Sequence, residues 1–182
     1  RRSGQPPRFI HHRYGADSAR WFAAASLVKL PAAALALERV ALHGLDGSTR
    51  IVLDAEPASG DWPPAESLDQ TVERCIRRVI TVSDNAEYNR LYEFLGPDAI
   101  QARLAQLGFT DARLIARLGS FDPVANRAVG GSRLLRADGA LVERRPPRRS
   151  AIAWRYPFGQ VLRGRGWMDG ETLVPGPHDF SH

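Results

Sequence analysis

The sequence is poor in lysine, cysteine and long apolar runs, and each shortage excludes a class of structure. Its 25 Lys and Arg residues include one lysine, Lys29. The single cysteine, Cys75, excludes an internal disulfide. No run of 18 or more apolar residues occurs, so the sequence predicts no membrane span. The five histidines show neither an HExxH pattern nor zinc-ligand spacing, and we expect no metal and no cofactor.

The 182 residues are enough for one ordinary domain, or for part of a larger one, and 43% hydrophobic content can fill a core. We expect a single domain over 1–182, with a helical region at 22–126 and an Arg/Gly/Pro-rich irregular region at 127–182. Residues 1–20 are polar and basic, and they lack the apolar core of a signal peptide.

The formal charge of +5 is concentrated in one segment. Between Arg133 and Arg165, nine arginines face two acidic residues, a local +7, so the rest of the chain carries −2. Such a segment can contact nucleic acid. Because it is rich in Pro and Gly without regular aromatic spacing, we favour a solvated loop and expect no nucleic-acid partner.

Residues 25–43 are the stretch around which the rest of the sequence is arranged. Leu27, Leu30, Ala34, Leu37 and Val40–Ala41 recur at helical spacing, which predicts a central, buried helix. Ser26 and Lys29 stand three residues apart, on one face of this helix near its positive end. Arginine does not lose its proton at workable pH, whereas a buried lysine can serve as a base. The alternative is a surface amine that merely follows a helix-start serine.

The pattern downstream alternates helices with short extended segments. Apolar spacing predicts helices over 69–81, 85–95 and 97–107, a strand over 50–53, and a hairpin joining 134–136 to 141–143. The second helix leads into Ser83-Asp84-Asn85. Taken alone, this string reads as a turn that caps the next helix. After Arg144 no periodicity predicts further structure.

Ser26-Leu27-Val28-Lys29 followed 57 positions later by Ser83-Asp84-Asn85 resembles the class A β-lactamase and penicillin-binding serine hydrolase superfamily. The resemblance covers residues 22–126 and implies an α+β fold, of which this chain holds mainly the helical portion with few short strands. It also implies a small-molecule acyl substrate, either a β-lactam or another amide or ester.

The resemblance assigns a role to each motif residue. Ser26 would be the nucleophile that forms an acyl-enzyme, and Lys29 would take or relay its proton. Ser83 would pass a proton to the leaving group, and Asn85 would hold Lys29 and the substrate amide. Asp84 would anchor the loop.

A third element, Asp122-Pro123-Val124-Ala125-Asn126, resembles the family's Glu-Pro-x-x-Asn loop. In that reading Asp122 activates the deacylating water and Asn126 helps to hold it. Aspartate is one methylene shorter than glutamate, and a misplacement of about 1 Å can cost roughly a hundredfold in rate. The alternatives are a shifted loop, slow deacylation, or a turn residue before proline.

The family's Lys-Thr/Ser-Gly strand has no counterpart, since no lysine follows Lys29. We expect the chain to be part of a larger hydrolase, or a member in which Arg163 or Arg165 binds the substrate carboxylate. A D-alanyl-D-alanine peptidase, or a non-catalytic domain of the same family, remains the alternative function. The resemblance also suggests export to the periplasm.

Overall fold

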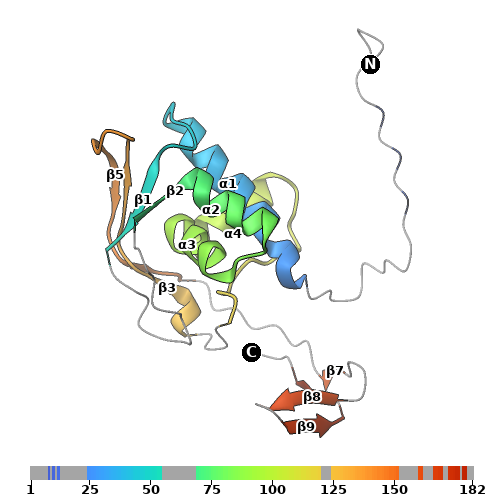
Figure 1. Ribbon diagram of the computed structural model, residues 1–182. Helices are drawn as coiled ribbons and strands as arrows, with labels where there is room; N and C mark the ends of the chain where they lie inside the picture. The colour runs from blue at the N-terminus through green and yellow to red at the C-terminus, as the bar shows by residue number, and fades with distance from the viewer. Residues whose placement is uncertain are drawn as a thin grey trace.

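The computed structural model describes residues 8, 10, 12, 24–54, 69–119 and 124–151, together with short C-terminal strands at 160–161, 166–169, 172–176 and 178–179 (Figure 1). Within these ranges it is an α+β structure, which confirms the predicted fold class. No described helix is both long and apolar enough to cross a membrane.

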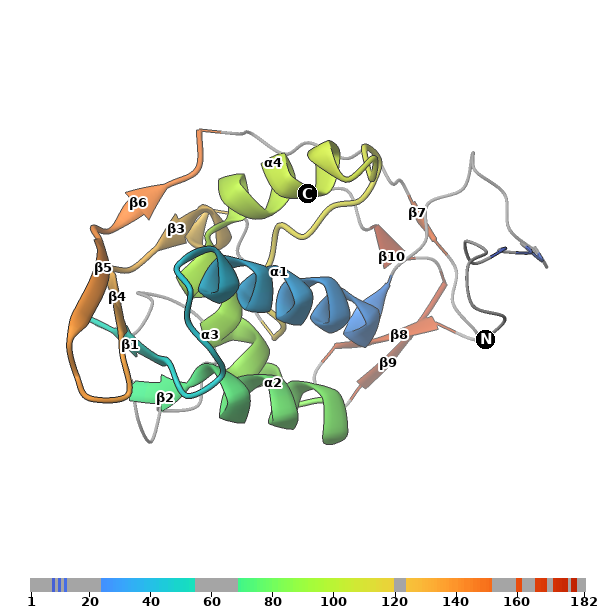
Figure 2. The same cartoon turned by 90° about the horizontal axis from the view of Figure 1, so that it is seen from above.

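Four α-helices form one layer of the molecule. They are α1 (Lys29–Leu42), α2 (Val72–Thr81), α3 (Asn85–Leu95) and α4 (Pro97–Gln106). A 3₁₀ turn, η1 (Ala25–Val28), precedes α1, and a second, η2 (Ala125–Arg127), precedes the strand β3. Seen from above, α1 runs between α2 and α4 (Figure 2). α1 therefore packs against all three of the other helices.

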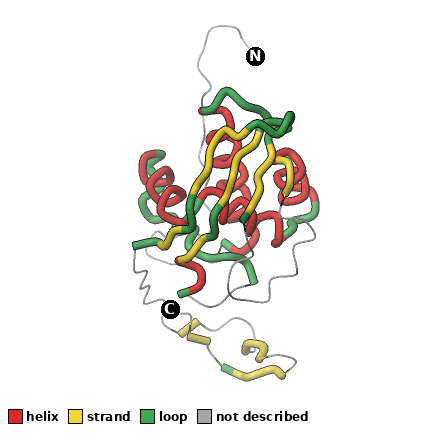
Figure 3. Tube along the Cα trace, turned by 90° about the vertical axis from the view of Figure 1, so that its left-hand side faces the viewer, coloured by secondary structure: helices red, strands yellow, loops and turns green. Residues whose placement is uncertain are grey.

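A four-stranded antiparallel sheet covers one side of the helices (Figure 3). Its strand order is β2-β1-β4-β5, with β1 at Arg50–Leu53, β2 at Asp69–Thr71, β4 at Ser132–Leu135 and β5 at Leu141–Arg145. The register places Ile51 opposite Leu134, both fully buried toward the helices. The remaining strands form two-stranded pairs: β3 (Ala128–Val129) with β6 (Arg148–Arg149), β7 (Gln160–Val161) with β10 (His178–Asp179), and β8 (Gly166–Asp169) with β9 (Thr172–Pro175).

Helix α3 is the centre of the core. Nine of its eleven residues, Glu87 through Leu95, are buried, and they include three large aromatic side chains. α1 presents the small side chains of Ala32, Ala33 and Ala36 to the same core. Because small residues on one helix leave room for large residues on its neighbour, α1 and α3 can pack closely at native density.

The recurring apolar residues that predicted the helix α1 do not all lie on its buried face. Leu27, Leu30 and Leu37 are 63%, 64% and 47% exposed. The buried face instead carries Lys29, Ala32, Ala33, Leu35, Ala36 and Val40. The helix is apolar around most of its circumference, so periodicity alone did not select a face. The observed rotation points Lys29 toward the protein interior.

Two other boundaries differ from the predictions. Asp69–Thr71 pairs with β1 as strand β2, so α2 begins three residues later than predicted, with the Thr71 hydroxyl accepting from the Arg74 amide as its N-cap. Strand structure also continues beyond Arg144, into β5, β6 and the C-terminal strand pairs. These strands are two to five residues long, too short for an alternating pattern to stand out.

The arginine-rich segment after residue 133 is not simply the solvated loop that the sequence predicted, because two of its arginines bind the backbone of α3. Arg145 donates to the carbonyls of Phe94 and Leu95, and Arg148 donates to those of Glu93 and Phe94. Cationic side chains at these unpaired carbonyls cap the C-terminus of α3. The next residue, Gly96, has φ 82°, and a Cβ there would meet the Arg148 guanidinium at 2.5 Å.

The orientation of α1 makes a prediction about stability. Leu35→Ala, at a 7% exposed position, should lower the free energy of unfolding by about 2–4 kcal/mol, because it leaves a cavity in the core. Leu30→Ala, at a 64% exposed position on the same helix, is the matched control and should change it by less than about 0.5 kcal/mol. Denaturant unfolding of both variants measures the difference. Equal losses of unfolding free energy in the two variants would contradict the orientation in which Leu35 is buried and Leu30 is exposed.

Candidate functional site

The amine of Lys29 lies at the centre of a polar cluster assembled from three elements. Its Nζ is 3.2 Å from the Ser26 Oγ in η1 and 2.8 Å from the Ser83 Oγ in the α2–α3 loop. It donates over 2.7 Å to the Oδ1 of Asn85, the first residue of α3, and it also contacts the Ser83 carbonyl oxygen. The structure thus brings together four of the predicted site residues.

The cluster has a buried floor and an open rim. Lys29 is 3% exposed, whereas the residues Ser26, Ser83 and Asn85 are exposed. A substrate arriving from solvent therefore meets the two hydroxyls and the amide before it meets the amine. A hydroxyl at the surface with an amine beneath it is an arrangement that can support covalent catalysis.

The contacts of Lys29 match the hydrogen-bonding capacity of a neutral amine. The Ser83 carbonyl and the Asn85 Oδ1 can only accept hydrogen bonds, so they occupy two N–H groups. A neutral amine has only two N–H groups, and its lone pair is then left for the hydroxyls of Ser26 and Ser83. The same geometry allows either hydroxyl to donate a proton to Nζ.

Burial lowers the pKa of Lys29, and the nearby negative charge of Asp84 opposes this by raising it. The net direction is downward, toward a side chain that can exist as a base. The groups in direct contact with Nζ are neutral oxygens, which do not hold a proton on the amine as a carboxylate would.

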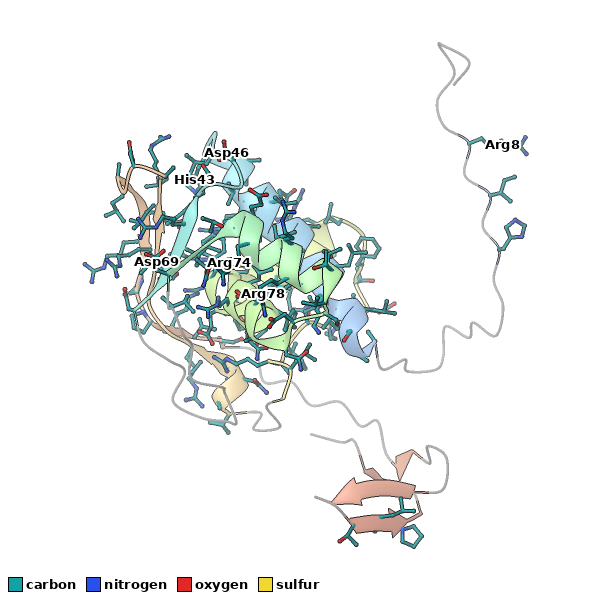
Figure 4. The ribbon with its side chains drawn as sticks, viewed as in Figure 1. Arg8, His43, Asp46, Asp69, Arg74 and Arg78 are labelled. Atoms are coloured by element: carbon teal, nitrogen blue, oxygen red, sulfur yellow. The ribbon has the colours of Figure 1, made fainter. Side chains whose placement is uncertain are left out.

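Asp84 is occupied in anchoring the loop. Its Oδ1 accepts from the Glu87 amide as the N-cap of α3, and its Oδ2 accepts from Arg78 Nε and Nη2 at 2.9 and 2.7 Å. Burial raises the pKa of Asp84, but these hydrogen bonds and the Arg78 charge outweigh it and keep the pKa below its usual value. Arg78, on α2 (Figure 4), therefore compensates part of the charge that acts on Lys29.

Two unusual backbone conformations flank the cluster. Among the described non-glycine residues, positive φ occurs at Ala25 (46°) and Ser83 (55°). Ala25 directly precedes Ser26, and Ser83 supplies both a hydroxyl and a carbonyl to Lys29. Left-handed backbone at non-glycine residues is costly and concentrates at functional sites, where it aims a side chain. The Lys29 cluster has such a residue in both segments that supply its hydroxyls, Ala25 beside Ser26 and Ser83 itself.

The two remaining predicted residues are placed differently. Asp122 lies outside the described residues. Asn126 is 4% exposed and belongs to a second buried cluster, in which its Oδ1 accepts from the Arg117 amide at 3.0 Å and its carbonyl accepts from the Tyr92 hydroxyl at 2.8 Å.

The sequence did not single out Arg78, Glu93 or Arg117. For Glu93 a signal existed, because an acidic residue lies within the apolar run Leu91-Tyr92-Glu93-Phe94-Leu95. A carboxylate in such a run is buried only with a partner, which predicts an arginine opposite it. Nothing local in the sequence identified that partner as Arg117.

Comparison with protein families finds one match, to the family described as "Beta-lactamase enzyme family", over residues 11–140. The matched region holds both motifs and all four helices. No curated protein matches the chain in the comparison.

The pKa of Lys29 can be measured directly by NMR, because the chain has a single lysine and therefore gives a single lysine signal. In protein labelled with ¹³C-lysine, the Lys29 Cε resonance should titrate with a pKa below that of a free lysine, because burial disfavours the ammonium. Arg78→Ala should raise this pKa by leaving Asp84 less compensated. Arg77→Ala, which removes an exposed arginine paired with Glu73 on the same helix, is the control and should leave it unchanged. A titration like that of a free lysine would contradict the lowered pKa of the buried amine.

Proposed function

The chain belongs to the β-lactamase enzyme family, and from this premise we propose that it is a class A-like serine hydrolase working through a Ser26 acyl-enzyme. The observation that carries the proposal is the contact of the buried Lys29 amine with both the Ser26 and the Ser83 hydroxyls. Its substrate is a small molecule with a strained or activated acyl group, a β-lactam or another amide or ester.

Acylation begins with the proton of Ser26. The Oγ attacks the substrate carbonyl carbon and forms the new C–O bond, while its proton passes over 3.2 Å to the neutral Nζ of Lys29. Negative charge develops on the carbonyl oxygen. The backbone N–H of Ser26, near the positive end of the η1–α1 segment, is suited to stabilise that charge.

The leaving group then departs with a proton. The C–N bond of an amide breaks only if its nitrogen is protonated, and Ser83 lies 2.8 Å from Nζ, on the open side of the cluster. A proton moves from the Lys29 ammonium to the Ser83 Oγ as the Ser83 proton moves to the leaving nitrogen. Lys29 returns to its neutral form and the acyl group stays on Ser26. Asn85 holds the amine in place throughout.

Deacylation uses water as the nucleophile. A water oxygen attacks the acyl carbon, the ester bond to Ser26 breaks, and the Ser26 Oγ regains a proton. We assign activation of that water to Asp122. We assign to Asn126 the anchoring of its own segment of chain, through its contacts with the Arg117 amide and the Tyr92 hydroxyl. In the family that the motifs resemble, such an enzyme acts in the periplasm, and we expect the same location here.

The two motif residues can be tested by covalent labelling of the full-length protein. A fluorescent penicillin, or a fluorophosphonate, should add one acyl or phosphonyl mass to the Ser26 peptide. Ser26→Ala should reduce the labelling rate at least about a thousandfold, since it removes the nucleophile itself. Ser48→Ala, at an exposed serine in the α1–β1 loop, should label like the parent protein.

The kinetics of the label then identify the activity. Rapid release of the acyl group is β-lactamase turnover, whereas a long-lived adduct on Ser26 would assign a penicillin-binding, D-alanyl-D-alanine peptidase type of activity. A folded parent protein that never labels at Ser26 would overturn the enzymatic proposal and leave a non-catalytic family domain.

The role of Lys29 as a base has its own test. Lys29→Arg keeps a cation at the site but removes a group that can be deprotonated, so acylation should slow by about 10²–10⁴-fold. In the parent protein, the acylation rate should rise with pH through the lowered Lys29 pKa, because only the neutral amine accepts the proton. Stopped-flow acylation rates against pH measure both effects. A pH-independent rate, or an active Lys29→Arg protein, would remove Lys29 as the base.

A further inference from the structure

Three arginine side chains converge on Phe94, near the C-terminal end of α3. Arg145 Nη1 and Arg148 Nη2 both donate to the Phe94 carbonyl oxygen, at 2.9 and 3.2 Å. The Arg39 guanidinium lies over the Phe94 ring, with its Cζ 5.5 Å from the ring centroid. Helix α1 and strands β5 and β6 thus each bring one guanidinium to the same residue.

The carboxylate of Glu143 is shared among these cations. Arg39 Nη2 donates to both of its oxygens, at 2.5 and 2.7 Å, and the Arg145 Nε is 3.8 Å from its Oε1. The His43 Nε2 is 3.5 Å from its Oε2 and adds a further positive charge when it is protonated. One negative charge is therefore divided between two guanidiniums and an imidazole.

The other carboxylates that act on the cluster are engaged by neighbours of their own. Glu93 and Asp98 act on the charge of Arg148. Glu93 is paired with Arg117, and Asp98 accepts a hydrogen bond from the Ser150 hydroxyl. Together with the three arginines of the cluster, the count is four guanidiniums against three carboxylates, a net charge of +1 with histidine neutral.

This surplus charge is partly withdrawn from water. The side chains of Arg39 and Arg145 are only 22% and 20% exposed. Burial, followed by the charges of Arg148 and Arg39, lowers the pKa of Arg145 to about 10, although Glu143 opposes the shift. Guanidiniums that repel one another in a half-buried place are stabilised by an anion that binds between them.

Helix capping uses only part of the hydrogen-bonding capacity of the cluster. The carbonyls of α3 engage Nη1 of Arg145 and Nη2 of Arg148. Arg39 Nε and Arg148 Nη1 are buried, and neither has an acceptor among the residues that the structure describes. Buried donors are costly to leave unmatched. Two of the three arginines therefore have a donor left for a further acceptor.

The chemistry of guanidinium groups indicates which acceptor fits. The planar fork of donors on arginine matches the oxygens of phosphates and carboxylates, and hydrogen bonds between such charged partners are the strong ones. Because the donors come from three separate elements, an anion with oxygens on all sides suits the cluster better than a planar carboxylate does.

We propose that Arg39, Arg145 and Arg148 form a binding site for a small tetrahedral oxyanion of the phosphate or sulfate class. The bound anion joins α1, β5 and β6 and stabilises the folded protein. The site lies at the opposite end of α3 from Asn85, which binds Lys29, and the eleven residues of this helix span about 16 Å. The inference therefore does not depend on the proposed function.

Inorganic phosphate is the probe for this site, added to the full-length protein at constant ionic strength with sodium chloride as the balancing salt. The melting temperature should rise with phosphate and then level off, since a ligand that binds only the folded state stabilises it. Isothermal titration calorimetry should show one phosphate bound per chain. Sulfate should compete for the site, because it presents the same tetrahedron of oxygens.

Variants locate the binding. Arg148→Gln removes a guanidinium but keeps an amide that can still donate to the carbonyls of α3, and it should weaken phosphate binding at least about tenfold. Arg144→Gln is the matched control: it makes the same change of charge at an exposed arginine whose side chain points to the other face of the sheet from Arg145. It should bind phosphate like the parent protein.

A second variant covers the case in which Arg148→Gln does not fold. Arg39→Lys keeps the positive charge beside Glu143 but removes the Nε donor, and it should show the same loss of affinity to a smaller degree.

The remaining outcomes would overturn the site. A folded parent protein without saturable stabilisation by phosphate would do so, as would an equal rise in melting temperature with chloride alone, which would mean general screening of charge. A folded Arg148→Gln protein with the affinity of the parent, or an equal loss in Arg144→Gln, would place the binding elsewhere. None of these measurements uses the labelling of Ser26, so a failure of this site is distinguishable from a failure of the proposed function.

Discussion

The structure depends on one buried amine, Lys29, and none of the carboxylates that the structure describes is in direct contact with it. Burying an ammonium without a partner is expensive, so such a group shifts toward its neutral form or acquires an opposite charge. Here the contacts are two hydroxyls, an amide oxygen and a backbone carbonyl. The arrangement leaves the amine able to accept a proton. The rotation of α1, its alanine-rich inner face and the left-handed backbone at Ser83 all serve to place these groups together.

The sequence predicted the residues of this cluster through the resemblance of two motifs to one family. Ser26 and Lys29 stand one helix turn apart, and Ser83 and Asn85 lie at the start of α3. Each motif alone had a plain structural alternative, and only the two together identified the site. The strand over 50–53 and the helix over 85–95 were also predicted with their observed bounds. The orientation of α1 was not, since a helix that is apolar on every side offers several equivalent faces. The choice was made by tertiary contacts, which bury Lys29 together with the alanine-rich face of α1.

Residues that act across long sequence separations escaped prediction for a related reason. The Arg117–Glu93 contact spans 24 residues and Arg145 caps α3 from 50 residues away. An arginine-rich sequence gives no indication of which guanidinium meets which carbonyl, because every arginine offers the same donors. The periodicity of the sequence predicted the helices. The side-chain contacts between distant segments could be identified only from the three-dimensional structure.

Two buried ionisable groups, Glu93 on α3 and Lys29 beside the start of α3, show how environment assigns a role. Glu93 faces a guanidinium that is itself buried. A backbone amide donates to the carboxylate and backbone carbonyls accept from the guanidinium, so the charge of Glu93 is compensated and its place is fixed. Lys29 faces neutral oxygens, and the negative charge that acts on it, Asp84, is engaged by Arg78. A side chain whose charge is fully compensated is suited to a structural role. A side chain whose charge is only partly compensated is suited to act as a base, since only a group close to losing its proton can exchange one. The same helix therefore carries a structural ion pair and a site for proton transfer, about two turns apart along its axis.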